Sequence, residues 1–278
     1  MLGIVIVSYR SDDRTVAFVR EELSKVRIPH QTVIVDNGAS AEEAEALGAR
    51  LPGVQVIAAG NGGYALGNNL GARWLREHVW PDRILFANND IRLESDCVVE
   101  ALTESLATHP EAGAVGPEVV GLDGLRQSPE PYMGLWKRYV WMYLSTPFLS
   151  RERKRRVFAL DFPEKAEEGF HYKLSGSFLM VDANAFFQAG MFDENTFLYA
   201  EENILSERLD AIGKGCWFCP SVRVVHEHGS TVKEHFRNKE SALLQFRSMA
   251  YYYMRYKGYS RLSVFLAKWI FRAVLLVR

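Results

Sequence analysis

The sequence lacks three features that would define other classes of protein. Its only cysteines are Cys97, Cys216 and Cys219, too few for a disulfide framework. It contains no run of 18 uncharged apolar residues, so no transmembrane helix is predicted. Its 33 Lys and Arg nearly balance 34 Asp and Glu, whereas a general nucleic-acid-binding protein is clearly basic. The short opening "MLGIVIV" has no basic n-region, so it predicts a first strand and not a signal peptide. The low number of cysteines predicts a reducing, cytoplasmic compartment.

Strand and helix patterns alternate through the first half of the chain. Short β-branched runs predict strands at 3–9, 31–37, 54–59 and 83–90, and the stretches between them predict helices at 12–26, 41–50, 64–79 and 96–110. Ser40 and Ser95 are the expected N-caps of two of these helices. The alternation predicts an α/β fold with a mostly parallel, Rossmann-like sheet and helices on both faces.

The second half is less regular. Residues 121–172 are rich in aromatics and carry a basic run at 151–156, so we interpret them as a variable insertion or mobile loop. A strand at 173–182, a helix at 200–213 and a strand with a following loop at 222–230 come next. Two helices separated at Gly258 are expected in the tail. The predicted division is a catalytic-type domain at 1–235 and a helical extension at 236–278.

Polar residues follow the predicted strands where each strand ends. In "RILFANNDIRLE" a buried run gives way to Asn88, Asn89 and Asp90, which cost desolvation unless something bonds or coordinates them. Asp36 and Asn61 follow two other strands. Carboxyl ends of parallel strands meet at one edge of a sheet, where ligands bind. The Asn-Asn-Asp cluster is therefore either a turn or an oxygen-ligated cation site that bridges to a phosphate.

Three other motifs have an ordinary and a functional interpretation. The glycine-rich stretch "GNGGYALGNNLGA" suits anion binding where a loop enters a helix, but it matches neither a phosphate-binding loop nor GxGxxG. Glu201 and Glu202 begin a predicted helix, where the dipole favours negative charge. His226 ends a strand, and its spacing from His228 is not a zinc signature.

Taken in order, seven motifs resemble the family 2 glycosyltransferases, which are inverting sugar transferases of the GT-A fold. The resemblance is closest to the bacterial rhamnosyltransferase-like branch and covers about residues 2 to 232. The motifs are "IVIVSYR", "VIVDNGAS", "AAGNGGYALGNNLGARW", "LFANND", "GAVGPEVV", "SGSFLMVDANAFFQAGMFDENTFLYAEENILSERL" and "VVHEHGST".

The resemblance implies a set of donor-binding residues. Asp36 corresponds to the residue that hydrogen-bonds the pyrimidine base of the donor. The other implied donor contacts are Val7, Ser8 and Tyr9 beside the base, Asn61, Gly67 and Asn68 along the nucleotide and its phosphates, Asn88 in the divergent Asp-x-Asp motif, and Asn89 beside the sugar.

The resemblance also implies metal, acceptor and catalytic residues. Asp90 corresponds to the Mg²⁺ or Mn²⁺ ligand, and His226 to a metal- or phosphate-contacting histidine. Ser175 and Gly176 would border the acceptor. Glu202 falls where the family usually carries the catalytic Asp of a Glu-Asp pair.

Two positions depart from the family pattern. Glutamate at position 202 carries one more methylene than aspartate, which moves its carboxylate by roughly an ångström and leaves the general base open between Glu201 and Glu202. Ile204 stands where many relatives have a second Asp.

The resemblance implies an inverting glycosyltransferase that moves a sugar from a UDP- or dTDP-linked donor to a glycan or lipid-linked acceptor. Its expected setting is bacterial surface polysaccharide synthesis at the inner face of the cell membrane. The alternative is a non-catalytic sugar-nucleotide-binding or scaffold subunit, supported by the departures at Glu202 and Ile204. A nucleotidyltransferase is disfavoured because the first loop lacks a glycine-rich phosphate clamp.

The tail has two interpretations that stay open. Aromatics, Lys and Arg lie among aliphatic residues at 251–278, as in a helix at a membrane interface. The same pattern suits a helix packed on the catalytic domain or on a second subunit of a homodimer.

Overall fold

The computed structural model describes residues 1–144, 166–227 and 238–277. The strands are β1 (Leu2–Ser8), β2 (His30–Asn37), β3 (Gln55–Ala59), β4 (Arg83–Ala87), β5 (Ile91–Leu93), β6 (Ala112–Gly121), β7 (Arg126–Ser128), β8 (Gly169–His171), β9 (Phe178–Asp182) and β10 (Gly215–His226). The helices are α1 (Asp12–Ala17), η1 (Phe18–Glu22), η2 (Leu23–Lys25), α2 (Ala41–Ala49), α3 (Tyr64–His78), α4 (Val98–Thr108), η3 (Lys137–Trp141), α5 (Met142–Leu144), α7 (Ala183–Gln188), α8 (Glu201–Asp210), α10 (Asn238–Tyr256) and α11 (Arg261–Val277).

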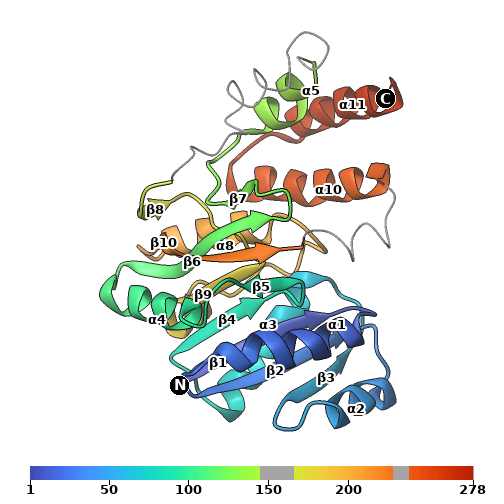
Figure 1. Ribbon diagram of the computed structural model, residues 1–278. Helices are drawn as coiled ribbons and strands as arrows, with labels where there is room; N and C mark the ends of the chain where they lie inside the picture. The colour runs from blue at the N-terminus through green and yellow to red at the C-terminus, as the bar shows by residue number, and fades with distance from the viewer. Residues whose placement is uncertain (145–165, 228–237, 278) are drawn as a thin grey trace.

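The strands form one curled sheet in the order β3-β2-β1-β4-β9-β6-β10-β5, with β7 on β6 and β8 on β10 (Figure 1). β1 pairs in parallel with β2 and β4, and β2 pairs in parallel with β3. β9 runs antiparallel between β4 and β6 and so joins the parallel first half to the second half. The expected α/β architecture with a mostly parallel sheet is confirmed.

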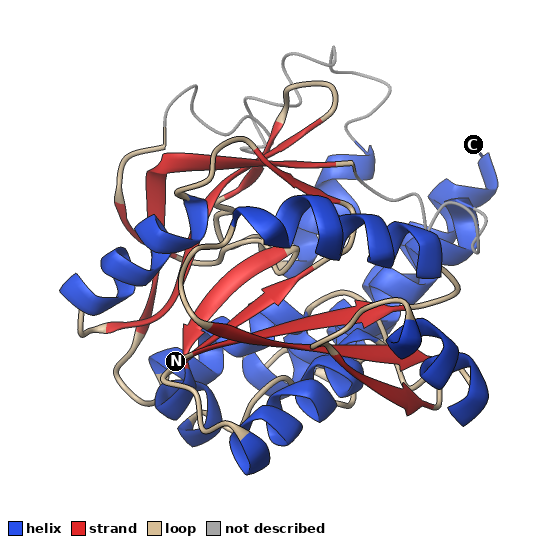
Figure 2. Ribbon diagram, turned by 60° about the horizontal axis from the view of Figure 1, so that its bottom comes forward, coloured by secondary structure: helices blue, strands red, loops and turns tan. Residues whose placement is uncertain are grey.

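Both faces of the sheet are buried, which explains why its strands read as nearly continuous apolar runs. Side chains of a strand alternate between faces. Ile4 and Ile6 of β1 therefore pack in one cluster with α1, α2 and α4, while Val5 packs in the other with α3, α7 and α8. The helices lie on both sides of the sheet (Figure 2).

The two predicted serine caps have different outcomes. Ser40 forms a full capping box at the start of α2: its hydroxyl accepts the Glu43 N–H at 3.2 Å, and the Glu43 carboxylate accepts the Ser40 N–H at 2.7 Å. Ser95 is not a cap. α4 begins two residues later than predicted, with Cys97 as its N-cap, and the Ser95 hydroxyl contacts the Cys97 Sγ at 3.3 Å instead.

The segment interpreted as a loop contributes to the fold at both of its ends. β7 extends the sheet beside β6, β8 pairs with β10, and η3 and α5 follow β7. These stretches form regular structure, the interpretation of 121–172 as a variable insertion or loop stays a prediction, and the basic run at 151–156 lies outside the described residues. The strand expected at 173–182 begins only at Phe178, and "CWFC" belongs to β10.

The tail forms the two predicted helices on either side of Gly258. Side chains from α10 and α11 share a third hydrophobic cluster with α8 and η3, including Ile204, Tyr139, Tyr253 and Phe271. One face of the tail thus packs on the catalytic part of the chain. Within the three described ranges, no helix combines the length and apolar character that a membrane crossing requires.

Candidate active site

Asp36 is the second-last residue of β2 and lies directly opposite Ser8, the last residue of β1. Its side chain is almost fully buried, and no described residue donates a hydrogen bond to its carboxylate. Burial, together with the charges of Asp12 and Glu43, raises the pKa of Asp36 to about 6. A buried acceptor without a donor is costly in the protein alone and suits a ligand that brings its own N–H.

The Asn89 side chain, just after β4, forms hydrogen bonds to residues at the start of α1. Its amide donates to the Ser11 hydroxyl at 2.9 Å and to the Thr15 hydroxyl at 2.8 Å. Thr15 in turn donates to Ser8 at 3.1 Å. The polar tip is therefore satisfied partly by the protein itself, and the implied contact of Asn89 with the donor sugar stays a prediction.

Asp90 and His226 meet where β5 pairs antiparallel with the end of β10. The Asp90 Oδ1 lies 3.2 Å from the His226 Nε2, and both side chains are about nine-tenths buried. The His226 Nδ1 lies 2.9 Å from the Gln127 Oε1. This contact orients the His226 ring and places its Nε2 beside the Asp90 carboxylate.

This pair fits a divalent cation, because a carboxylate oxygen and an imidazole nitrogen, which are both cation ligands, lie 3.2 Å apart in a buried position. Burial opposes ionisation of Asp90, but the His226 ring and Arg14 together hold the pKa of its carboxyl below its usual range. In the described part of the chain, no three His, Cys, Asp or Glu side chains converge. The protein therefore supplies at most a partial ligand set of these types, and a phosphate-bearing ligand and water would complete it.

Tyr64, which the sequence analysis did not single out, lies at the centre of the site. Its hydroxyl donates to the Gly176 carbonyl at 2.8 Å and its backbone N–H to the Phe197 carbonyl at 2.9 Å. Burial and the carboxylates of Glu202, Glu201 and Asp90 raise the pKa of Tyr64. The Tyr64 hydroxyl is therefore joined through Gly176 to Glu202, whose carboxylate accepts the Gly176 N–H.

The turn before Tyr64 requires glycine. Gly63 has φ +93°, and a Cβ there would lie 2.2 Å from the Phe197 carbonyl oxygen. The glycine-rich loop thus lets the start of α3 approach the segment that leads into α8. Its position in the sequence, directly after a strand, was the available signal.

Glu201 and Glu202 occupy the first turn of α8, as predicted, in contrasting environments. Glu201 is buried, and its Oε1 has no hydrogen-bond partner. Burial and the neighbouring charge of Glu202 raise the pKa of Glu201 to about 8, so Glu201 is mostly protonated at neutral pH. Glu202 is half-buried, and its Oε1 accepts the Gly176 N–H at 3.1 Å.

The backbone that presents this pair is strained. Tyr199 and Ala200 have φ values of +70° and +73°, a region that non-glycine residues rarely adopt. Gly176 is also constrained, because a Cβ there would lie 2.7 Å from the Glu202 Oε1. Such strain at a polar, concave position is typical of functional sites.

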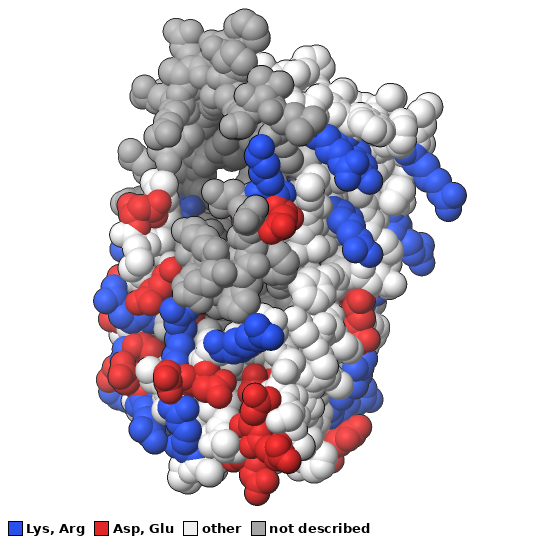
Figure 3. Space-filling view, turned by 90° about the vertical axis from the view of Figure 1, so that its right-hand side faces the viewer, with Lys and Arg blue, Asp and Glu red and all other residues white. Residues whose placement is uncertain are grey.

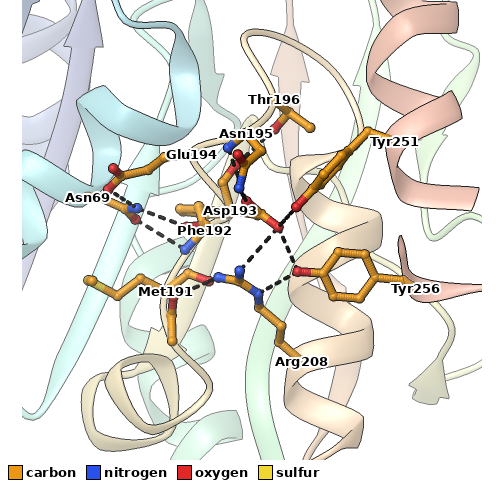
Figure 4. Close-up of polar contacts among 11 residues, drawn as sticks. Asn69, Met191, Phe192, Asp193, Glu194, Asn195, Thr196, Arg208, Tyr251 and Tyr256 are labelled. Carbon is orange, nitrogen blue, oxygen red and sulfur yellow. Dashed lines mark hydrogen bonds and ion pairs between the residues drawn. The ribbon is translucent and has the colours of Figure 1, made fainter. Parts of the chain in front are cut away.

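A polar clamp holds the segment before α8 between two helices (Figure 4). On the α3 side, the Asn69 amide donates to the Phe192 carbonyl and accepts the Phe192 N–H. On the tail side, the Asp193 carboxylate accepts the hydroxyls of Tyr251 at 3.0 Å and Tyr256 at 2.6 Å and pairs with Arg208 at 3.2 Å. α10 therefore fixes the entry to the helix that carries the Glu pair.

The remaining predicted donor residues lie at or beneath the same edge. Gly67 faces the sheet, where a Cβ would lie 3.0 Å from Val7, so it serves close helix–sheet packing. The Asn68 amide donates to the Tyr64 carbonyl at 3.0 Å, and Asn61 is exposed. Tyr9 packs near Gly38. Contacts of these residues with a nucleotide stay predictions.

Ser175 and Gly176 lie beside the Glu202 carboxylate, where the acceptor border was predicted. The Ser175 hydroxyl lies 2.8 Å from that of Ser177, and the Asn88 N–H donates to the Ser177 carbonyl at 2.8 Å. These bonds bring the Asn88–Asp90 tip next to the segment that touches the Glu pair.

The cysteines play no part in this site. Cys216 and Cys219 are free and buried, and burial raises the pKa of the Cys216 thiol to about 11. A thiol that is buried and protonated is a poor nucleophile.

Comparisons with known proteins show which sequences and folds this chain is similar to. No model of a protein family matches the sequence. The chain is 27% identical over 301 residues to an N-acetylglucosaminyl-diphospho-decaprenol L-rhamnosyltransferase of Mycobacterium tuberculosis, with 100% of this chain and 91% of the relative covered. It is 23% identical over 250 residues to a low-salt glycan biosynthesis hexosyltransferase of Haloferax volcanii, with 89% of this chain and 73% of the relative covered.

Two solved structures have a similar fold. A mannosyltransferase from Pyrobaculum calidifontis in complex with GDP-Man and Mn²⁺ superposes with a TM-score of 0.58 at 11% identity, covering 99% of this chain and 73% of that one. TarS 1–349 from S. aureus in complex with UDP-GlcNAc superposes with a TM-score of 0.55 at 12% identity, covering 99% and 71%.

The fold and these relatives define the chain as a glycosyltransferase with the GT-A fold. Within that class, it is consistent with the rhamnosyltransferase-like branch of family 2.

Proposed function

We propose that this enzyme transfers a sugar, with inversion, from a UDP- or dTDP-linked donor to a lipid-linked or glycan acceptor in bacterial surface polysaccharide synthesis. The observation that carries the proposal is the hydrogen-bond network that joins Tyr64, Gly176 and Glu202, together with the Asp90–His226 pair at the end of β10. The diphospho-decaprenol in the name of the mycobacterial relative supports a lipid-linked acceptor.

In this proposal, the Asp36 carboxylate recognises the pyrimidine base of the donor by accepting a hydrogen bond from it. The N3–H of a uracil or thymine ring is a donor, and the buried Asp36 carboxylate is an acceptor that no described residue satisfies. The carboxylate must be ionised to accept this bond without donating a proton of its own. Purine bases lack an equivalent N–H flanked by two carbonyls, so the site favours pyrimidines.

Asp90 and His226 would hold a Mg²⁺ or Mn²⁺ ion, because a carboxylate oxygen and an imidazole nitrogen lie side by side there. The ion would neutralise the diphosphate of the donor as negative charge develops on it. The Gln127 side chain orients the His226 ring, and the paired segment at the end of β10 holds both ligands in place.

Glu202 acts as the general base. Its carboxylate takes the proton from the acceptor hydroxyl while that oxygen attacks the anomeric carbon, and the bond from that carbon to the diphosphate oxygen breaks. The diphosphate leaves with the electron pair, and attack from the opposite side inverts the anomeric centre. Glu201 is the poorer base, because it is buried and mostly protonated at neutral pH.

The reaction is proposed to occur at the inner face of the cell membrane, where a lipid-linked acceptor presents its head group. The tail supports this location with basic and aromatic side chains. The protein would bind there peripherally.

A donor screen tests the proposal. UDP-sugars and dTDP-sugars with Mn²⁺ are expected to raise the melting temperature, because a ligand that binds only the folded state stabilises it by mass action. GDP- and ADP-sugars should have little effect. A stabilising donor that is never transferred or hydrolysed, with any acceptor or with water, would favour the non-catalytic alternative.

Asp36→Asn should weaken binding of a pyrimidine diphosphate by about 1–3 kcal/mol, because it removes the charged acceptor. In the unaltered protein, affinity should fall as the pH drops below about 6, where Asp36 becomes protonated. Calorimetry with UDP at pH 5 to 8 measures both effects. Unchanged affinity in Asp36→Asn would contradict base recognition by this residue.

The same substitution should raise stability above pH 6. Burial raises the folded-state pKa of Asp36 to about 6, above the usual range of an aspartate, so ionising Asp36 costs stability, which is lost as the pH rises from about 4 to about 6. Asparagine cannot ionise, so the melting temperature of Asp36→Asn should exceed that of the unaltered protein at pH 7.5 and match it near pH 3.5. The opposite order would contradict the burial penalty.

A further inference from the structure

The outer face of α11 is apolar. Leu262, Phe265, Leu266 and Trp269, here called the α11 stripe, are 45% to 66% exposed. The rings of Phe265 and Trp269 contact each other edge to face, with centroids 6.1 Å apart. Four large apolar side chains exposed on adjoining helical positions form a patch that a soluble surface rarely carries without a partner.

The stripe is not needed to hold α11 in place. Successive residues of an α-helix turn by about 100°, which puts Val264, Ala267 and Phe271 on the side of the helix opposite the stripe. Those three side chains are buried in the cluster shared with α8 and η3. The helix is therefore anchored by one apolar face and presents a second one outward.

Basic residues flank the stripe along one edge. The same helical geometry places Arg261, Lys268 and Arg272 in one row between the stripe and the buried face, and all three are exposed. From residue 241 to residue 278 the sequence has seven Lys or Arg and no Asp or Glu, although the whole chain has a net charge of -1. Lys and Arg dominate the upper part of the described surface in Figure 3, and most Asp and Glu lie lower.

We infer that the α11 stripe and its basic row dock on an anionic lipid bilayer, with α11 lying in the plane of the interface. Aromatic and aliphatic side chains enter the boundary between head groups and acyl chains, while Lys and Arg reach the phosphates. The choice of a bilayer over a protein partner rests on the proposed function, in which the acceptor is lipid-linked, and on the charge of this face.

Docking through α11 would bring the membrane surface close to the helix that carries the base. α11 shares its buried cluster with α8, and α10 bonds to α8 through the Glu207 carboxylate, which accepts Tyr252 at 3.1 Å and Lys257 at 2.9 Å. The tail is thus joined firmly to the catalytic part, so a docked α11 fixes how the active site faces the bilayer.

Vesicle flotation with the full chain tests the inference without donor or acceptor. The protein is expected to bind vesicles containing phosphatidylglycerol and to bind pure phosphatidylcholine vesicles at least tenfold more weakly, with binding reduced by salt. Phe265→Ser/Trp269→Ser and Lys268→Glu/Arg272→Glu should each reduce binding to anionic vesicles at least tenfold. Leu122→Ser/Leu125→Ser is the matched control, since it removes two exposed apolar side chains outside the tail, and it should bind normally.

Three results would overturn the inference: no binding of the unaltered protein to anionic vesicles, equal binding by the stripe variants, or a solution dimer that the stripe variants convert to monomer without any vesicle binding. The last result would assign the stripe to a second copy of the chain. Donor hydrolysis should be unchanged in Phe265→Ser/Trp269→Ser. Vesicle binding by a protein that turns over no donor would uphold docking and refute only the proposed function.

Discussion

Glu202→Gln is expected to lower turnover by roughly 10²–10⁴-fold while leaving donor affinity and folding nearly unchanged. Glutamine is nearly isosteric with glutamate and can still accept the Gly176 N–H, but it cannot take a proton from the acceptor hydroxyl. Single-turnover rates with a saturating donor, together with calorimetric donor affinity, measure the two quantities separately.

Glu201→Gln is the control beside it. Because Glu201 is mostly protonated at neutral pH, a neutral amide replaces a neutral acid, and turnover should change far less. The folded-state pKa of about 8 lies well above the usual pKa of a glutamate, about 4.3, so stability is lost as the pH rises between these values. Glu201→Gln should lack that loss and melt at a higher temperature at pH 8.

Glu202→Asp tests the geometry of the pair. If the backbone of α8 keeps the family position, aspartate should preserve or raise activity; if the loop has adapted to the longer side chain, activity should fall. Normal turnover in Glu202→Gln with a collapse in Glu201→Gln would move the base to Glu201, and normal turnover in both would refute the mechanism.

Asp90→Ala is expected to abolish the part of donor binding that depends on Mn²⁺. The substitution leaves a single protein ligand, His226, at the proposed cation site. Calorimetry with UDP should show the same affinity with and without Mn²⁺ in this variant, and a clear gain with Mn²⁺ in the unaltered protein.

Asp210→Ala is a suitable control, because it removes an exposed carboxylate at the far end of α8. It should keep the response to Mn²⁺. The melting temperature of Asp90→Ala without metal should fall, because the contacts with His226 and Arg14 that lower the pKa of Asp90 stabilise its ionised form in the folded protein; a Mn²⁺ titration of the folded variant therefore separates the metal role from this loss. A full Mn²⁺ response in Asp90→Ala would refute the metal role of this residue.

Local patterns were enough to predict the elements that carry the site. The capping box at Ser40, the strand that ends in Asp36 and the helix that begins with Glu201 each depend on a few neighbouring residues. The motif order also led to the correct fold class. Such features are determined by hydrophobic period and capping chemistry, which act within one or two turns of chain.

The predicted ends of strands and loops differ from the structure where polar tertiary contacts replace regular backbone pairing. The strand expected at 173–182 begins late because the Ser175 N–H donates to the Ser128 hydroxyl and the Gly176 N–H to the Glu202 carboxylate, instead of to backbone carbonyls of a neighbouring strand. The start and end of the 121–172 segment joined the sheet because β6 and β10 offered edges that a local pattern cannot reveal.

The sequence by itself determined which residues end the strands and which carboxylates begin α8. Only the tertiary structure decided how they act together. Tyr64 reaches Gly176 across 112 residues and His226 reaches Gln127 across 99, and these contacts orient the phenol and the imidazole. Burial also gives Glu201 a raised pKa that sets it apart from Glu202, although the two residues are adjacent and chemically identical. The environment of a side chain depends on what packs around it, and that is decided by segments distant in the chain.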